Sequence, residues 1–521
     1  MATGSGTLLV VDRVAGTVHD AVLVSGGRVI GVGQSASFDT RGLIIDRYPG
    51  TSLVAGLGDA HFHPLGFTAA LNRLNVARCG SFDELRTKVR AAAPDLAPEE
   101  PLIGMRLNDD GLAEGRLPTR FELDTMVSDR PLLLYRYCGH IAVANTAGLD
   151  AAGVGPDTGD PIGGSLDRDG EGRPNGVLRE TAVSIVGDVL GGRTGSLTPD
   201  QVLSGLSGLV GAGLTRLGAI ISTAGFCGVS NELDLVANIA RDLPLHLSVL
   251  VHAATPGELE VAAARLSNAG RRVSFLGMKD FTDGSLGGHT AALRRPYADW
   301  RHERGTNRFD LDRIGPIAER SLALGGSVAL HAIGDAACRD VIGYFGELRE
   351  AGVEAERLRI EHASMLTDDD VEALAATGAV ASVQPAFLAS ETQWLATRLG
   401  DRVGMTYRFK TMQDAGIPLA GGSDCPVEPP FPFAGMAVAR DRAGLVPSES
   451  LDARAALDLF TEGVSLALRE PTPLAVGSRA DFTLVDVDPM TATPDQLRAA
   501  EVVSTWIEGK PHVPERFEWD Q

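Results

Sequence analysis

Eight short apolar runs, most of them separated by stretches with helical spacing, constrain the fold of this chain more than any other feature. The stretches between the later runs repeat the strand–helix pattern of βα units. Eight parallel strands are the number that closes a (β/α)8 barrel. We therefore expect an α/β protein built on a TIM-like (β/α)8 barrel, with strands within residues 51–63, 213–220, 245–251, 273–281, 326–335, 357–364, 379–387 and 417–426.

The interval between the first two runs is too long for a single crossover helix. About 30 residues usually make a whole βαβ unit, whereas residues 65–200 intervene here. Their Gly- and Asp-rich turns indicate a folded cap over the first barrel loop rather than a linker. Residues 1–53 and 471–521 alternate like half-buried antiparallel strands. We therefore expect one small β-sandwich domain built from both termini beside a barrel of residues 54–470.

The charge balance narrows the choice of partners. The 521 residues carry a formal net charge of -21, which repels phosphate backbones and anionic membrane surfaces, because both are recognised by Lys and Arg. No basic segment precedes the short apolar stretch at the start, and no apolar run approaches the ~20 residues that cross a bilayer. We expect a cytoplasmic protein that binds a small molecule, without nucleic-acid or membrane partners.

Polar, metal-capable side chains stand where most of the expected barrel strands end. The carboxyl ends of barrel strands carry the chemistry of this fold, because the loops open to solvent there. Within "HFH", His61 and His63 point to the same side of the strand, since side chains alternate with a period of two. Each histidine alone also fits a hydrogen-bonded structural role, but their recurrence at one rim favours a shared site. The rim residues are His61, His63, Lys279, His331, His362 and Asp424.

These residue types match the ligands of a divalent metal. Zinc accepts neutral imidazole nitrogen and carboxylate oxygen, and a catalytic site leaves at least one position open for water. His61, His63 and Asp424 supply such a set. Manganese, iron and nickel accept the same donors, so the sequence favours zinc without fixing the metal.

An ordered set of motifs resembles the amidohydrolase superfamily, in the branch that contains N-substituted formamide deformylase (amidohydrolase family 3). The resemblance covers nearly the whole chain. The motifs that carry it are "GLGDAHFHPLG", "DRPLLLYRYCGHIAVANTAGL", "DGEGRPNGVLRE", "MKDFTDGSLGGHTAALRRPYAD", "LHAIGDAA", "RIEHAS", "VASVQPAF", "GGSDCPVEPPFP" and "GSRADFTLVDVDP".

The resemblance implies a binuclear metal centre. His61, His63 and Asp424 would hold one divalent ion, and His331 and His362 would hold a second. Lys279 would lie between the two ions, carboxylated on its amine so that the carbamate bridges them. A mononuclear site with Lys279 as a charged neighbour stays open.

The reaction implied by this site is hydrolysis of a carbon–nitrogen bond other than a peptide bond, in a small amide, an N-substituted formamide or a cyclic amide. A metal lowers the pKa of its bound water to ~7 and so produces hydroxide at neutral pH. Asp424 would act as general acid and base. The same metal site also suits an ester, a lactone or a phosphotriester, and a non-catalytic, metal-stabilised barrel is a third reading.

Several residues near the rim are candidates for contacts with the substrate. His140 matches a histidine of similar proteins and would bind the substrate oxygen, although a structural role in the cap fits equally well. His289 stands where relatives have arginine, and if that arginine binds an anionic or polar part of their substrate, the substrate here would differ. Homodimerisation is implied by the resemblance alone. The candidate substrate-binding residues are His140, Asp283, His289, Gln384, Phe387 and Trp394.

Overall fold

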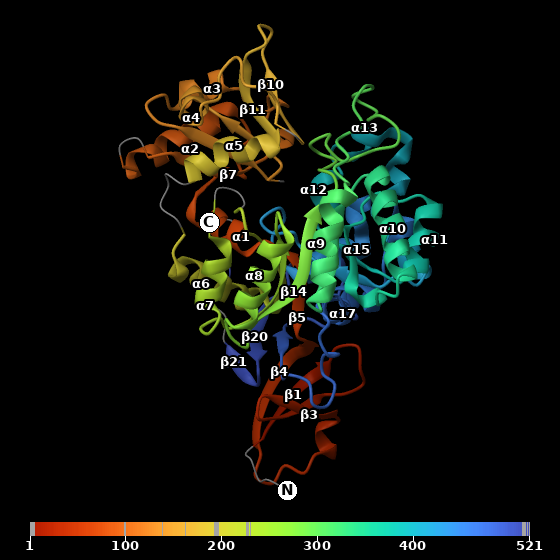
Figure 1. The fold of residues 1–521 in the computed structure, drawn as a ribbon. Coiled ribbons are helices and arrows are strands. Elements are labelled where there is room, and N and C mark those ends of the chain that lie inside the picture. The colour runs from red at the N-terminus through yellow and green to blue at the C-terminus, as the bar shows by residue number, and fades with distance from the viewer. Residues whose placement is uncertain are drawn as a thin grey trace.

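A parallel eight-stranded sheet forms the centre of the computed structural model, which describes residues 6–97, 100–137, 139–161, 163–191, 197–225, 229, 231–512, 517 and 519. The strand order is β18-β17-β16-β15-β14-β13-β12-β5, as the sequence predicts for a (β/α)8 barrel. The barrel lies between an inserted sheet and a sheet built from both ends of the chain (Figure 1). Its strands are β5 (Leu57–Phe62), β12 (Leu214–Ser222), β13 (His246–His252), β14 (Val273–Phe281), β15 (Ser327–Ala332), β16 (Leu358–His362), β17 (Val380–Val383) and β18 (Leu419–Gly421).

The barrel closes where the end of β18 meets the end of β5. A parallel bridge joins Phe62 to Cys425. The backbone N–H of Asp424 donates to the carbonyl of His61 at 2.8 Å, and the N–H of His63 donates to the carbonyl of Cys425 at 3.0 Å. The first and last strands of the barrel therefore place their carboxyl ends side by side.

The barrel interior is apolar near the strand starts. Small and β-branched side chains fill it, and α17 (Glu462–Ala467) covers this end. Barrels of this kind pack their interior in layers, which leaves the carboxyl ends for polar groups. The interior cluster consists of Ala60, Ile220, Leu250, Leu276, Ala329, Val380, Ala420, Val464, Ala467 and Leu468.

Some helices on the outside of the barrel begin at a residue whose side chain caps the first turn. At α8, the Thr255 side chain accepts from the N–H of Glu258 at 3.2 Å, and Pro256 opens the first turn. At α11, Thr367 and Asp370 cap the helix reciprocally. The helices are α1 (Pro64–Asn72), α6 (Pro199–Gly208), α7 (Glu232–Ile239), α8 (Pro256–Ser267), α9 (Leu311–Ala323), α10 (Asp335–Glu350), α11 (Asp368–Thr377), α12 (Phe387–Glu391), α13 (Leu395–Leu399), α14 (Phe409–Asp414), α15 (Pro432–Asp441) and α16 (Ala453–Phe460).

A mixed sheet with its own apolar core is inserted between α1 and α6. The strand order is β10-β11-β9-β8-β7-β6, and β11 leads directly into α5. This unit lies in the interval where the sequence predicts a folded cap. Its elements are β6 (Leu74–Asn75), α2 (Phe82–Ala92), β7 (Leu102–Leu107), α3 (Arg120–Met126), β8 (Leu132–Arg136), β9 (Ile141–Ala144), α4 (Thr146–Ala151), β10 (Gly164–Arg168), β11 (Pro174–Glu180) and α5 (Thr181–Gly191).

Strands from both ends of the chain form one seven-stranded sheet, in the order β21-β20-β19-β4-β1-β2-β3. The long strand β4 joins the two ends, because it pairs with β1 and with β19. The elements are β1 (Thr7–Val14), β2 (Ala21–Ser25), β3 (Arg28–Gly33), β4 (Ile44–Ala55), β19 (Phe482–Val485), α18 (Pro494–Arg498), β20 (Val502–Ile507) and β21 (Lys510–His512). The boundaries expected for the domains stay a prediction. No helix in the described part of the chain is long and apolar enough to span a membrane.

Candidate metal centre

The two histidines of the "HFH" motif face one carboxylate. His61 lies in β5, and His63 follows the strand immediately. The Nε2 atom of His61 lies 3.2 Å from Asp424 Oδ1, and the Nε2 atom of His63 lies 3.0 Å from the same oxygen. All three side chains are largely buried. The closure of the barrel therefore brings both imidazoles to the residue that follows β18.

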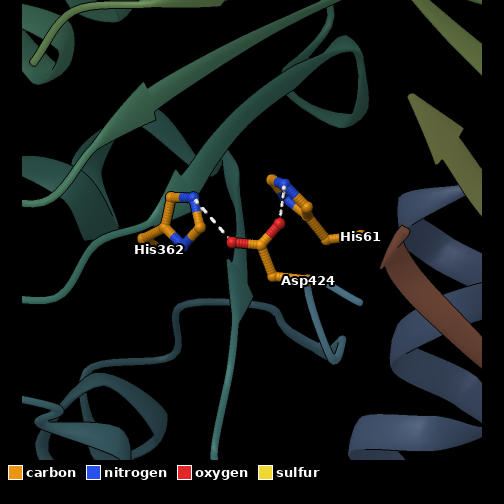
Figure 2. A group of neighbouring side chains, drawn as sticks. All are labelled: His61, His362 and Asp424. Carbon is orange, nitrogen blue, oxygen red and sulfur yellow. Dashed lines mark ion pairs between the residues drawn. The ribbon is translucent and has the colours of Figure 1, made fainter. Parts of the chain in front are cut away.

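Two further histidines from neighbouring strands lie beside this group. His331 of β15 and His362 of β16 have ring centroids 4.5 Å apart, and the His362 ring is 4.8 Å from that of His61. The Nε2 atom of His362 lies 4.0 Å from Asp424 Oδ2. One ligand atom each of His61, His362 and Asp424 lies within 4.8 Å of the others, and Figure 2 shows both imidazoles directed at the carboxylate.

A buried carboxylate orients His61. Glu361 Oε2 lies 2.6 Å from His61 Nδ1 and accepts a hydrogen bond from it. The other carboxylate oxygen accepts from Arg359 Nε at 2.9 Å. The side chains of Glu361 and Arg359 are fully buried. Since Nδ1 is occupied by Glu361, Nε2 is the nitrogen that His61 presents to the site.

His362 and His331 are oriented in the same way. Gln384 Oε1 lies 2.7 Å from His362 Nδ1 and accepts from it. The carbonyl of Gly284 lies 3.1 Å from His331 Nε2 and accepts from that nitrogen. His362 therefore presents Nε2 and His331 presents Nδ1 as the free acceptor. Gln384 therefore orients His362, and its expected contact with a substrate stays a prediction.

The backbone at two of these residues lies in the left-handed region. The φ angle is 73° at His362 and 56° at Asp424. A residue other than glycine pays about 1–3 kcal/mol for such a conformation, and it persists where the surroundings hold it. Position 422 requires glycine because of close packing rather than backbone conformation. A Cβ on Gly422 would lie 2.8 Å from the backbone nitrogen of His61. The two strand ends approach too closely for a larger residue.

Lys279 reaches the same region from β14. Its side chain is fully buried, with Nζ 3.3 Å from the carbonyl of Asp280 and 3.6 Å from the centroid of the Phe281 ring. Burial lowers the pKa of Lys279 to about 8, although the charges of Glu361 and Asp424 oppose this effect.

The electrostatics of the group suit a cation. Burial holds the pKa of His331 and His362 well below the usual value, so both are neutral imidazoles with a lone pair to share. Burial alone would raise the pKa of Asp424, but His61 and His63 hold it well below its usual range. Neutral imidazoles around an ionised carboxylate are the donors that zinc and similar divalent ions bind. The residues present therefore fit a divalent metal.

His140 reaches over the barrel mouth from the loop between β8 and β9. Its ring centroid is 5.8 Å from that of His331. Glu180, at the end of β11, lies with Oε2 2.9 Å from His140 Nδ1, and Arg308 Nη2 donates to the same oxygen at 2.6 Å. The inserted sheet and the barrel thus position this imidazole together.

Three cavities surround the group. The largest, of about 290 Å³, runs from His63 and His140 toward α5. Two smaller cavities, of about 30 Å³ each, are lined by His140, His331 and Asp424 among others. Phe387 lines one of the small cavities and stacks on His362 with centroids 5.9 Å apart.

Three of the expected substrate contacts lie outside the lining of these cavities. The carboxylate of Asp283 accepts from the N–H groups of Ala292, Ile333 and Gly334 at 2.8–3.0 Å, and it thereby connects two loops. His289 pairs with Asp299 at 3.2 Å. Trp394 is buried with the Arg398 guanidinium 5.7 Å from its ring centroid. Their roles toward a substrate stay predictions.

Several polar residues of the site are not predicted by the sequence patterns. Glu361, Glu180 and Arg308 orient two of the histidines, and Asp59 accepts from the N–H of Ser423 at 3.1 Å across the closure of the barrel. Burial raises the pKa of Asp59 to about 6. A usable signal existed in "RIEH", where an apolar strand carries two opposite charges two residues apart and therefore on one face.

Comparisons with known proteins agree with the geometry. The sequence profile described as "Amidohydrolase family" matches residues 49–513. The putative amidohydrolase YtcJ of Bacillus subtilis is 31% identical over 474 residues, which cover 88% of this chain and 89% of that protein. The N-substituted formamide deformylase of Arthrobacter pascens is 26% identical over 94% of each chain. The crystal structure of an uncharacterised metal-dependent hydrolase from Pyrococcus horikoshii OT3 is similar with a TM-score of 0.74 and 26% identity, covering 94% of this chain and 99% of that one.

Proposed function

Because this chain belongs to the amidohydrolase family and is a metal-dependent hydrolase, we propose that it hydrolyses a carbon–nitrogen bond other than a peptide bond in a small amide. N-substituted formamides are the first substrate class to test, since a relative that spans the whole chain carries that activity in its name. The observation that carries the proposal is the convergence of His61, His362 and Asp424 at the mouth of the barrel.

The proposed centre holds two divalent ions, with zinc favoured. His61, His63 and Asp424 hold the first ion, and His331 and His362 hold the second. The free acceptor nitrogens of the oriented imidazoles support this assignment.

Carboxylation of Lys279 completes the proposed centre. The amine reacts with carbon dioxide to give a carbamate and releases a proton. The buried Nζ, next to a carbonyl and an aromatic ring, has an environment that disfavours a full positive charge. Metal analysis with and without bicarbonate tests this step. Binding of two ions per chain should require bicarbonate, whereas binding of a single ion should not.

The chemistry that the metal supplies when bound is a lowered pKa of water and polarisation of the substrate carbonyl. Asp424 is the general acid and base that this chain supplies for the reaction. Its carboxylate is ionised and buried, so Oδ2 accepts a proton from the attacking water and returns it to the leaving nitrogen. Glu180 accepts from His140 Nδ1, so His140 can donate from Nε2 to the substrate oxygen when the imidazole carries both protons, with Glu180 balancing the charge.

Turnover by metal-depleted and zinc-loaded protein on matched substrates tests the proposal. The panel contains N-substituted formamides, cyclic amides, an ester, a lactone and a phosphotriester. We expect zinc to restore hydrolysis of the amides, and Asp424→Asn to lower kcat by about 10²–10⁴-fold. Asp150→Asn, an exposed change on α4, serves as the matched control. Hydrolysis of the oxygen esters alone would overturn the assigned bond, and a metal-dependent melting temperature without turnover would overturn catalysis.

A further inference from the structure

The largest cavity beside the metal centre lies between the inserted unit and the barrel. Its volume of about 290 Å³ is close to the lower end of small-molecule sites. His63 and His140 line its inner end, and α5 forms a wall. Figure 1 shows α5 on the part of the inserted unit that faces the barrel. A substrate held at the centre therefore has room to extend along α5.

The walls of this cavity differ in character. Ile220, Ile221 and Phe281 supply an apolar surface from β12 and β14. The α5 wall presents Ser184 and Asp188, which lie four residues apart and so on one helix face. A ligand here meets apolar surface along its length and an acidic group on the helix.

Asp188 is the carboxylate of this cavity that lacks a partner among the residues that the structure describes. Glu180 is paired with His140 and Arg308. Glu232 accepts from the N–H of Ser222 at 2.9 Å. Asp188 makes no such bond with any described residue. It is exposed to solvent at the cavity, and desolvation by the surrounding walls raises its pKa.

The positive charge in the cavity lining is already neutralised. Arg308 Nη2 donates to Glu180 at 2.6 Å and to the carbonyl of Asp283 at 2.8 Å. An anionic substituent would therefore find little to bind, whereas a cation would find at Asp188 a carboxylate that no described residue neutralises.

We infer that this cavity takes the nitrogen substituent of the substrate, and that Asp188 selects a substituent with an apolar body that ends in a primary ammonium group. The inference rests on the proposed function, because the site beside His63 and His140 then holds the amide. The formyl or other small acyl group faces the small cavities that His140, His331 and Asp424 line.

A pair of substrates that differ in one group tests the selection. N-(5-aminopentyl)formamide and N-hexylformamide have the same length, and an ammonium replaces a methyl group. We expect the wild-type protein to prefer the charged substrate in kcat/KM, and Asp188→Asn to reduce that preference, measured as the ratio of the two kcat/KM values, about fivefold. Asp150→Asn alters the net charge equally outside the cavity and should leave the preference unchanged. An equal preference in wild type and Asp188→Asn would overturn the inference.

Binding of unreactive analogues separates this inference from the proposed reaction. Calorimetry on zinc-loaded protein compares hexylamine with 1-hexanol, which has the same length and no charge. We expect tighter binding of the amine, by about fivefold, and loss of this difference in Asp188→Asn. If the difference appears without formamide hydrolysis, the reaction is wrong and the cavity assignment stands. If the formamides are hydrolysed but neither preference depends on Asp188, the cavity assignment is wrong and the reaction stands.

Discussion

Replacement of Glu361 by glutamine tests how the buried charge pair controls the metal site. Glu361 Oε2 lies 2.6 Å from His61 Nδ1, and Oε1 accepts from Arg359 at 2.9 Å. All of these side chains are at most 1% exposed, so water cannot replace the lost charge. Glu361→Gln keeps the size of the side chain and removes one negative charge.

The expected effect has two parts. A carboxylate that orients a metal-binding histidine is worth about 10–100-fold in metal affinity, which corresponds to roughly 1.4–2.7 kcal/mol. Removal of one partner of a buried ion pair costs about 3–5 kcal/mol, and the amide oxygen still accepts one hydrogen bond. We therefore expect the free energy of unfolding to fall by about 3 kcal/mol, because Arg359 loses its neutralising partner.

Competition with a chromophoric chelator measures zinc affinity, and urea unfolding of the metal-free protein measures stability. Glu372→Gln is the matched control, because Glu372 is exposed on α11 and lies away from the site. A folded Glu361→Gln protein that binds zinc as tightly as wild type would refute the argument that Glu361 positions His61.

Three further changes test the surroundings of the site. Asp59→Ala leaves the donors of Ser423 and His61 unsatisfied, so urea unfolding should show a loss of about 3 kcal/mol; an unchanged midpoint would contradict this. Gly422→Ala places a Cβ 2.8 Å from the His61 nitrogen and should weaken zinc binding at least about tenfold, which titration would reveal. Burial raises the pKa of Glu391 to about 8 from 4.5, so its protonated form stabilises the fold below pH 4.5 and this contribution is lost as pH rises through 8. Glu391→Gln should therefore lose less stability than wild type between pH 5 and 9, by up to about 4 kcal/mol; parallel curves would rule this out.

The barrel and the rim histidines could be predicted because their signals are local. Parallel strands place their carboxyl ends at one edge, and a period of two decides which side chains share a face. His61, His63, His331 and His362 stand at strand ends, and the structure brings them into one group with Asp424.

The remaining parts of the site depend on contacts between distant segments. Glu361 meets a histidine 300 residues away, and nothing in a strand pattern identifies a partner at such a separation. His289 and Trp394 lie in loops or at a helix start, where no period defines the direction of a side chain. The predicted homodimer also depends on a surface rather than a pattern, and light scattering would measure it.

The contact between β5 and β18 makes the proposed metal site depend on a late part of the chain. Asp59 and Ser423 meet at this contact although they are 364 residues apart. At about 5–20 residues per second, a ribosome needs roughly 20 to 70 s to make the intervening chain. During that time the early imidazoles have emerged without Asp424. A chain that stops short of β18 lacks this carboxylate, so metal held through Asp424 would mark molecules in which β18 has been made and paired.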